Sequence, residues 1–359
     1  MNDKNLRRYG LDVLRILLAF MVITLHINAG ATGKVLSYST EFPWNIIVGG
    51  VTTLCYPAVN CYVLICGFFS WNKNDVKKKL FRLWLSLLFF SILGYMIVCI
   101  ALNKMFNITE LIKRFFPLIR GEWWYMVDYF ALVLLLPAIN KMIECLSKNQ
   151  HKKLNILCLI LFSVLPMFNK WEDQFGVNYG YGLLWFIALY IIGAYLGKYS
   201  SFERLNLKVI KSRPFSSFAI LYFFVSFLIM LIGKILGMIG VDFYLNPYNS
   251  IFSLIQSLCL FLAFLNLDLK NRLIVTAVKY VAPLSFASYL FHCQEDIDVY
   301  IWQLIKPWEY TNNKSIIVVW IAIVIAVFTT SIVLEKIRQL FFGKINGRIE
   351  DIIQRIYGK

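Results

Sequence analysis

The chain has 359 residues, of which 59% are hydrophobic and 17% aromatic, and its formal net charge is +16. This composition is not that of a soluble protein, and it indicates a chain that a lipid bilayer surrounds. In a soluble protein the positive charge would suggest a nucleic-acid partner, but lysine and arginine beside membrane spans set orientation instead. We therefore expect the lipid bilayer as a partner, and no nucleic acid.

Hydrophobic runs follow one another along the whole chain. A helix needs about 20 mostly apolar residues to cross the bilayer core, and a shorter run can cross inside a bundle. About ten runs qualify, which predicts one all-α bundle of membrane helices over residues 1–359. The predicted spans are Leu11–Asn28, Ile46–Phe68, Leu80–Leu102, Trp123–Cys145, Leu154–Phe168, Tyr181–Leu196, Phe215–Ile239, Ile251–Leu267, Pro283–Ile305 and Ser315–Leu334.

Basic residues are distributed unevenly between the loops on the two sides of these spans. Ten spans place both termini on one side, and most of the 36 lysines and arginines lie on that side. Because basic loops stay in the cytoplasm, we expect cytoplasmic termini and a multi-pass protein of the cell membrane. The tail, residues 335–359, has apolar residues at helical spacing, which predicts a helix in the cytoplasmic interface or one packed against the bundle.

The first predicted span carries an arginine and a histidine at a depth where polar groups are costly. Arg15 and His26 share a helical face, within about 20° of each other and roughly 16 Å apart along the axis. Asp12 precedes Arg15 by three residues and is expected to pair with it at the cytoplasmic entrance. Arg15 could instead be a snorkelling topology anchor, and His26 a hydrogen-bonded histidine of the bundle.

Two further segments supply candidate binding residues. The fourth predicted span begins with aromatic residues, which also fit an interfacial belt, and Asp128 follows them. The basic run at 73–82 is either a solvated cytoplasmic loop or a site for the phosphates of a nucleotide cofactor. The candidate residues of the two segments are Trp124, Tyr125, Asp128, Lys78, Lys79 and Arg82.

The ninth predicted span is the least hydrophobic, so we expect it to line water. His292, Glu295 and Asp296 have the spacing i, i+3 and i+4, which lets a carboxylate orient or charge the imidazole from the same helical face. The acidic residues come late in the span. The alternative is therefore a helix that ends after His292 and continues as an external loop.

The eight cysteines lie mostly within or beside apolar segments. They form no Cys-x-x-Cys pair, and no histidine lies at the spacing of a zinc site. We interpret them as small buried residues and expect no metal.

Four motifs in this order resemble the membrane-bound acyltransferase-3 family, and the resemblance covers nearly the whole chain. Residues 11–15 with His26 ten intervening residues later are similar to the family's arginine and histidine signature. Residues 66–68, Cys-Gly-Phe, are similar to its Ser-Gly-Phe, and residues 124–125 look like its Trp-Tyr span. Residues 285–292, SFASYLFH, are similar to its late segment that ends in histidine. The cysteine at position 66 and the acidic stretch after His292 depart from the pattern.

The resemblance implies a stand-alone enzyme that moves an acetyl group from acetyl-CoA to a hydroxyl of an exported or lipid-linked carbohydrate, without a metal. It implies His26 as the general base, because the unperturbed pKa of histidine lies near neutrality. Arg15 would bind a CoA phosphate or the pantetheine arm. The expected catalytic residues are His26 and Arg15. The expected substrate-binding residues are Asp12, Trp124, Tyr125, Asp128, His292 and Glu295, and the expected cofactor-binding residues are Arg15, Lys78, Lys79 and Arg82.

Two other functions are compatible with intramembrane polar residues. A proton-linked transporter or flippase could use Arg15, His26 and the ninth span as its path, although the chain lacks the paired, helix-broken repeats of many transporters. A membrane sensor or scaffold without catalysis is the third reading. Release of CoA from acetyl-CoA by the purified protein separates the enzyme from both.

Overall fold

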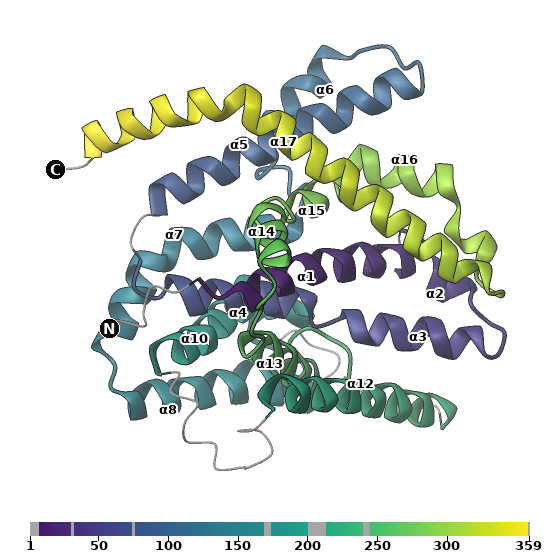
Figure 1. The fold of residues 1–359 in the computed structure, drawn as a ribbon, viewed down its shortest axis with the longest axis vertical. Helices are drawn as coiled ribbons and strands as arrows, with labels where there is room; N and C mark the ends of the chain where they lie inside the picture. The colour runs from purple at the N-terminus through teal and green to yellow at the C-terminus, as the bar shows by residue number, and fades with distance from the viewer. Residues whose placement is uncertain are drawn as a thin grey trace.

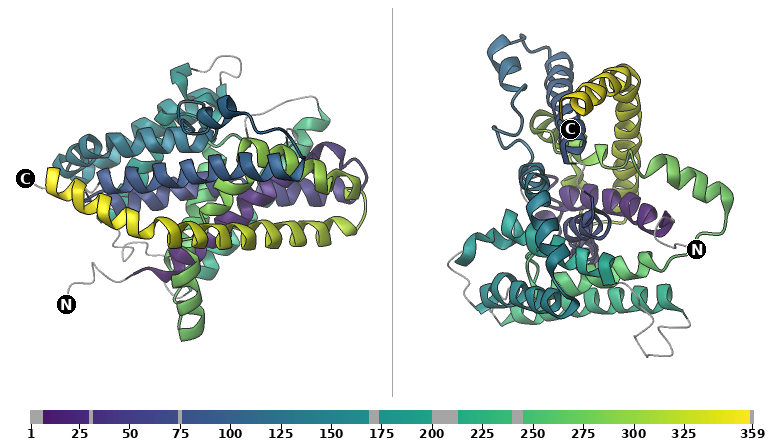
Figure 2. Two further views of the ribbon diagram at one scale, coloured as in Figure 1. Left: turned by 90° about the horizontal axis from the view of Figure 1, so that it is seen from above. Right: turned by 90° about the vertical axis from the view of Figure 1, so that its left-hand side faces the viewer.

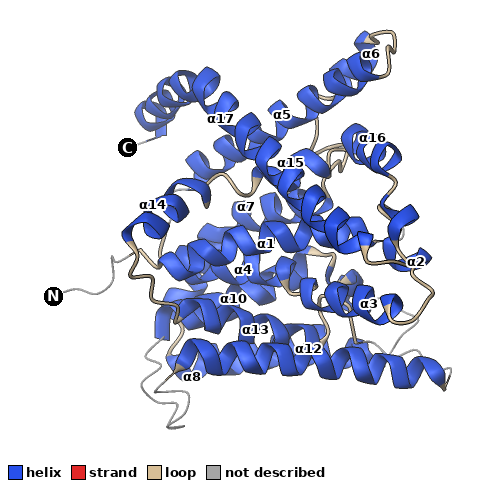
Figure 3. Cartoon of the chain, turned by 45° about the vertical axis from the view of Figure 1, so that its right-hand side comes forward, coloured by secondary structure: helices blue, strands red, loops and turns tan. Residues whose placement is uncertain are grey.

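A computed structural model describes residues 7–29, 32–73, 76–168, 174–199, 213–239 and 245–357, without the side chains of Lys77, Gln174 and residues 344–357. Every regular element in these ranges is a helix, and none of them is a strand (Figures 1 and 3). The structure therefore confirms the predicted all-α class.

Seven described helical segments are long and apolar enough to cross a membrane. They are Tyr9–Asn28 (α1), Trp44–Ser70 (α3, Trp44–Cys55, with α4, Ala58–Ser70), Lys78–Ala101 (within α5, Val76–Ala101), Trp124–Cys145 (α7), Lys148–Phe168 (from α8, Lys148–Leu159, to α9, Leu165–Phe168), Pro214–Met238 (α12) and Ser315–Gly343 (within α17, Ser315–Tyr357). Two shorter apolar helices are α10, Leu183–Tyr199, and α13, Ile251–Leu265. The remaining α-helices are α2, Val35–Tyr38, α6, Ile108–Lys113, α14, Arg272–Val281, α15, Ala287–His292, and α16, Glu295–Ile305.

The predicted span Pro283–Ile305 is wrong as one continuous helix. α15 ends at His292 and α16 begins at Glu295, with Cys293 and Gln294 between them. The Gln294 side chain accepts hydrogen bonds from two backbone N–H groups in the first turn of α16, which therefore has its own N-cap. The acidic residues that follow occupy the first turn of α16, where the helix dipole favours negative charge.

Helix α4 lies in the middle of the bundle, next to α1 and α10 (Figure 1). Its contact with α10 is close because glycines meet backbone there. A Cβ added at Gly67 of α4 would collide with the Tyr190 carbonyl oxygen, and one added at Gly193 of α10 with the Leu64 carbonyl oxygen. Small residues of this kind let membrane helices approach to backbone contact, where van der Waals packing is strongest.

The first turns of the predicted tail pack against the bundle. Helix α17 continues without interruption to Tyr357 and bends along its length (Figures 1 and 2). Glu335 and Arg338 on it are buried and joined by a 2.7 Å ion pair, and the Phe342 ring lies 6.0 Å from the Phe89 ring of α5. Of the apolar residues behind the interfacial prediction, Ile337, Leu340 and Phe341 are exposed, and the side chains from 344 onward lie outside the described residues.

Candidate active site

Near the start of α1, the Asp12 carboxylate binds both Arg15 and Arg7. Asp12, which is almost fully buried, accepts hydrogen bonds from Arg15 Nη1 and from Arg7 Nε, each at 2.6 Å. One carboxylate thus fixes two guanidinium groups, and the Arg15 side chain keeps about a third of its surface exposed. The predicted pairing of Asp12 with Arg15 is confirmed.

A cavity of about 450 Å³ lies beside these residues. We name it the basic cavity, because Arg15, Lys79 and Arg82 line it. Lys79 Nζ lies 3.5 Å from Cys66 Sγ and 5.0 Å from the centre of the Tyr129 ring, so the ammonium is directed toward the interior of the bundle. Lys78, the other predicted cofactor residue of this segment, is not among the lining residues.

A second cavity, of about 260 Å³, contains His26 and is lined mainly by aromatic rings. We name it the aromatic cavity. The Trp124 ring is stacked with the Tyr248 ring at 6.1 Å and lies 4.5 Å from the Tyr181 ring. The rings that line the cavity are those of Tyr56, Tyr62, Trp124, Tyr125, Tyr181, Tyr248, Phe286 and Tyr289.

The two cavities have a wall in common. Tyr62, Tyr125 and Phe286 line both of them. Their rings contact one another at centroid distances of 6.1 to 6.4 Å, and the Tyr62 hydroxyl donates a 3.2 Å hydrogen bond to the Arg15 carbonyl oxygen. Arg15 therefore lies on one side of an aromatic partition and His26 on the other.

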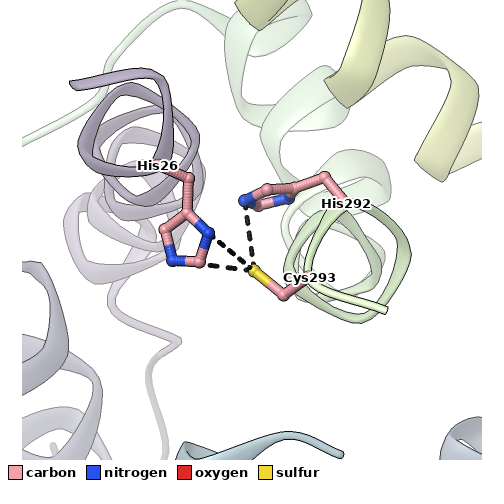
Figure 4. Close-up of side chains that lie close together, drawn as sticks. All are labelled: His26, His292 and Cys293. Atoms are coloured by element: carbon pink, nitrogen blue, oxygen red, sulfur yellow. Dashed lines mark hydrogen bonds between the residues drawn. The ribbon is translucent and has the colours of Figure 1, made fainter. Parts of the chain in front are cut away.

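Three ionisable side chains meet beside the aromatic cavity, one from α1 and two from the end of α15 (Figure 4). The His26 and His292 rings face each other edge-on, with centroids 5.0 Å apart. Cys293 Sγ lies between them, 3.2 Å from His26 Nδ1 and 3.3 Å from His292 Nε2. The sequence offers His292, Glu295, Asp296 and Asp128 as partners of His26, and of these four the structure brings only His292 to it.

Hydrogen bonds to neighbouring elements fix the end of α1, where His26 lies. The Asn28 side chain donates a 2.9 Å hydrogen bond to the Thr52 hydroxyl on α3, and it accepts one of 2.9 Å from the Trp320 indole on α17. The Gly33 N–H donates to the His26 carbonyl oxygen at 2.9 Å. These bonds satisfy carbonyl and amide groups at a buried helix end and fix the position from which the imidazole projects.

The predicted orientation of His292 by a carboxylate is wrong. Glu295 Oε2 accepts from Arg114 Nη1 at 3.0 Å and from Arg120 Nη2 at 2.5 Å, while Asp296 accepts from Arg114 Nη2 at 3.0 Å. His292 Nδ1 is 2.5 Å from the Ser288 carbonyl oxygen of its own helix. The break after α15 turns the acidic residues toward the loop before α7, so a backbone carbonyl orients the imidazole.

Arg114 is buried and is the centre of a polar network that joins α16 to this loop. Besides Glu295 and Asp296 it faces Glu122, whose side chain has no exposed surface and lies 3.5 Å away. Glu122 also accepts hydrogen bonds from Ser91 at 2.6 Å and from Gln294 at 2.7 Å. Burial raises the pKa of Glu122, and these hydrogen bonds oppose the shift.

Of the remaining predicted substrate-binding residues, two line a cavity and one does not. Trp124 and Tyr125 line the aromatic cavity. Asp128 is half-buried on the same helix and lines neither cavity.

Several residues of the site were not predicted from the sequence. Cys293 was interpreted as a packing cysteine, although its place directly after His292 was a signal. Tyr62 lies in an apolar segment and Phe286 in the motif at residues 285–292, and only the fold brings their rings together as a partition. Tyr181 and Tyr248 come from loops far apart in sequence, and Tyr248 is held by a 2.8 Å hydrogen bond from Asn60 to its carbonyl oxygen.

Comparison with protein families gives one result that covers most of the chain. Residues 8–336 match the acyltransferase domain of the acyltransferase-3 family. The matched region contains His26, His292, Cys293 and, apart from Arg7, all the residues that line the two cavities. Comparisons with curated proteins and with solved structures give no match. The chain, a bundle of apolar helices, therefore belongs to the acyltransferase-3 family of membrane acyltransferases.

Proposed function

We propose that this protein is an integral membrane O-acyltransferase that moves an acetyl group from acetyl-CoA to a hydroxyl of a cell-surface or lipid-linked carbohydrate. The observation that carries the proposal is the pair of cavities that share one aromatic wall. A charged donor and a sugar acceptor need different surroundings, and the two cavities differ in this way. The thioester of a donor in the basic cavity is separated from His26 only by the aromatic partition between the two cavities.

The basic cavity suits the donor. Guanidinium and ammonium groups form charge-assisted hydrogen bonds with phosphates, and Arg15, Lys79 and Arg82 present such groups around one volume. Asp12 keeps Arg15 in place before the donor arrives, so less conformational entropy is lost on binding. We assign Lys78 a place outside the cavity, at most near its entrance.

The aromatic cavity suits the acceptor. A sugar ring has an apolar face of C–H groups, and flat aromatic rings such as those of Trp124 and Tyr248 can pack against it. The tyrosine hydroxyls around the same volume supply donors and acceptors for the sugar hydroxyls. A cavity of about 260 Å³ has room for one sugar unit rather than a long chain segment.

In the proposed reaction, His26 takes the proton of the acceptor hydroxyl while the hydroxyl oxygen attacks the thioester carbonyl carbon. The tetrahedral intermediate collapses, its carbon–sulfur bond breaks, and the CoA thiolate leaves and takes up the proton held by His26. His292, fixed by its bond to the Ser288 carbonyl oxygen, presents Nε2 toward the same region, and there it steadies the acceptor hydroxyl. The reaction needs no metal cofactor.

The proposal includes a membrane arrangement. We propose ten crossings of the cell membrane with both termini in the cytoplasm, the ninth being made by α15 and α16 together. The start of α1 and the end of α17 lie toward the same end of the bundle, which supports an even number of crossings (Figure 1). Arg15 then faces the cytoplasm, where acetyl-CoA is made, and His26 lies deeper.

Replacement of the proposed base tests the function. We expect His26→Ala to reach the membrane in normal amount and to lower the rate of CoA release and of O-acetylation of the glycan by roughly 10² to 10⁴-fold, the usual contribution of a general base. The matched control is His151→Ala. His151 is equally a histidine of the bundle, but it bonds to the Ile191 carbonyl oxygen and lines neither cavity.

Full acetylation by the His26→Ala protein would contradict the proposal. A transporter with the same residues would release no CoA from acetyl-CoA in the purified state, whatever the acceptor. The wild-type protein is therefore assayed first for CoA release with soluble sugar acceptors.

A further inference from the structure

The cluster beside the aromatic cavity has the composition of a metal site as well as of an acid–base site. One ligand atom each from His26, His292 and Cys293 lie within 4.8 Å of one another. Two of the contacts are shorter, at 3.2 and 3.3 Å from the sulfur to the nearest imidazole nitrogens. In a tetrahedral zinc site, bonds of about 2.3 Å to sulfur and about 2.0 to 2.1 Å to nitrogen place the ligand atoms roughly 3.5 Å apart. Small side-chain rotations would convert one arrangement into the other.

The orientation of His292 is a second, independent observation that points to a metal. Its Nδ1 bonds to the Ser288 carbonyl oxygen, which assigns the proton to Nδ1 and leaves the lone pair on Nε2, the atom that faces Cys293. Metal-binding histidines are typically oriented by such a bond from the other ring nitrogen to a carbonyl or carboxylate. The cluster is also accessible, since His26 lines the aromatic cavity and Cys293 is only partly buried.

The donor atoms select the kind of ion. Two imidazole nitrogens and one thiolate favour thiophilic transition metals, whereas Mg²⁺ and Ca²⁺ require oxygen ligands. The nearest acidic residues along the chain, Glu295 and Asp296, are bound to Arg114 and are not directed at the cluster.

We propose that His26, His292 and Cys293 bind one thiophilic divalent cation, with Zn²⁺ as the expected ion, and that its binding inhibits the acyltransferase. Binding converts the Cys293 thiol to a thiolate and releases its proton to water, and the fourth coordination position is left for a water molecule from the aromatic cavity. The metal takes a lone pair of His26, which then cannot accept the proton of a hydroxyl. The inhibition rests on the proposed role of His26, but the binding does not.

Spectroscopy with Co²⁺ tests the binding without any assay of activity. The full-length protein, purified in detergent or nanodiscs, is titrated with Co²⁺ and then with Zn²⁺. We expect one Co²⁺ per chain, a cobalt–thiolate charge-transfer band, and loss of the band when Zn²⁺ displaces the cobalt. The variants Cys293→Ser and His292→Ala should lose the band. The matched control Cys145→Ser removes another thiol, one that is exposed and distant from the cluster, and should keep it.

Zinc titration of CoA release tests the inhibition. We expect Zn²⁺ to inhibit the wild-type and Cys145→Ser proteins, a chelator to restore their activity, and Cys293→Ser to need at least about tenfold more Zn²⁺ for half-inhibition of its own activity. An active wild-type protein that shows no cobalt band, or a Cys293→Ser protein that keeps the band, would overturn the metal site. A protein that binds Co²⁺ at this site but never releases CoA would contradict the proposed function and leave the site standing.

Discussion

The ionisable side chains inside the apolar bundle occur in pairs or clusters, and each group has a physical reason for its position. Asp12 is buried between two arginines, because a carboxylate at that depth is tolerated only with compensating charge and hydrogen bonds. The His26 and His292 rings meet edge to face, although the two residues are 266 positions apart in the chain, roughly three quarters of its length. In both cases the role of a residue depends on its partner.

Arg15 is expected to act on the phosphates of the donor. The variant Arg15→Gln should raise the KM for acetyl-CoA by about tenfold or more with little change in kcat, because a hydrogen bond to a charged group contributes about 1.5 to 3 kcal/mol. The measurement is steady-state CoA release. Acetyl-pantetheine, which lacks the phosphates, is the control donor, and its KM should be the same in both proteins. An equal loss with both donors would place Arg15 elsewhere in the reaction.

Two local features of the helices shape the site: the close contact of α4 with α10, and the N-cap that starts α16. Gly67 belongs to the Cys-Gly-Phe motif, and its position against α10 gives that motif a packing role. Gln294 and the acidic first turn of α16 end a helix that hydropathy alone would continue. As a consequence Cys293 lies at a helix end, beside His26, instead of within a regular turn.

The contact of α4 with α10 predicts a sharp difference between glycines. The variant Gly67→Ala should be destabilised by about 1 to 3 kcal/mol, since the added methyl group meets a backbone carbonyl that cannot move aside. Gly237→Ala on α12 is the control, because nothing lies within 4 Å of the added Cβ there. Thermal unfolding in detergent measures both. Equal unfolding midpoints for the two variants would show that α4 and α10 can move apart without loss of stability.

The network around Arg114 predicts a second stability difference. The variant Arg114→Ala should lose about 3 to 5 kcal/mol, because Glu122 would remain buried without its cation. Lys113→Ala removes the neighbouring cation, whose ion pair with Glu110 is exposed, and should change the unfolding midpoint far less. Denaturant or thermal unfolding compares the two. A small effect of Arg114→Ala would mean that water replaces the guanidinium in the network.

Over the whole molecule, the bundle separates two chemically different cavities by one aromatic partition. Figure 2 shows several long helices running in similar directions. The basic cavity lies beside Arg15 near the start of α1, and the aromatic cavity lies beside His26 near the end of that helix. In the proposed function, the donor binds on one side of this partition and the acceptor on the other.

The proposed topology is tested with epitope tags. Tags at the two termini should be accessible to antibody only after the cells are permeabilised, whereas a tag inserted after Met105, in the exposed turn between α5 and α6, should be accessible on intact cells or spheroplasts. Labelling of a terminal tag on intact cells would reverse the orientation or make the number of crossings odd.

The sequence by itself determined the all-α membrane fold, the family, and the shared face of Arg15 and His26. The fold and the shared face follow from hydropathy and helical periodicity, and the family follows from the resemblance of four ordered motifs; all of these are local properties of the chain. It was wrong about the span Pro283–Ile305, because a helix break that depends on the Gln294 cap changes hydropathy little.

Only the tertiary structure decided the partners of the site. The sequence could not choose between His292, Glu295, Asp296 and Asp128 as neighbours of His26, and it overlooked Cys293. The choice depends on where the end of α15 meets α1 and on the attraction of Arg114 for the acidic residues. Contacts between distant segments depend on how helices pack against one another, and a linear pattern of residue types does not contain that information.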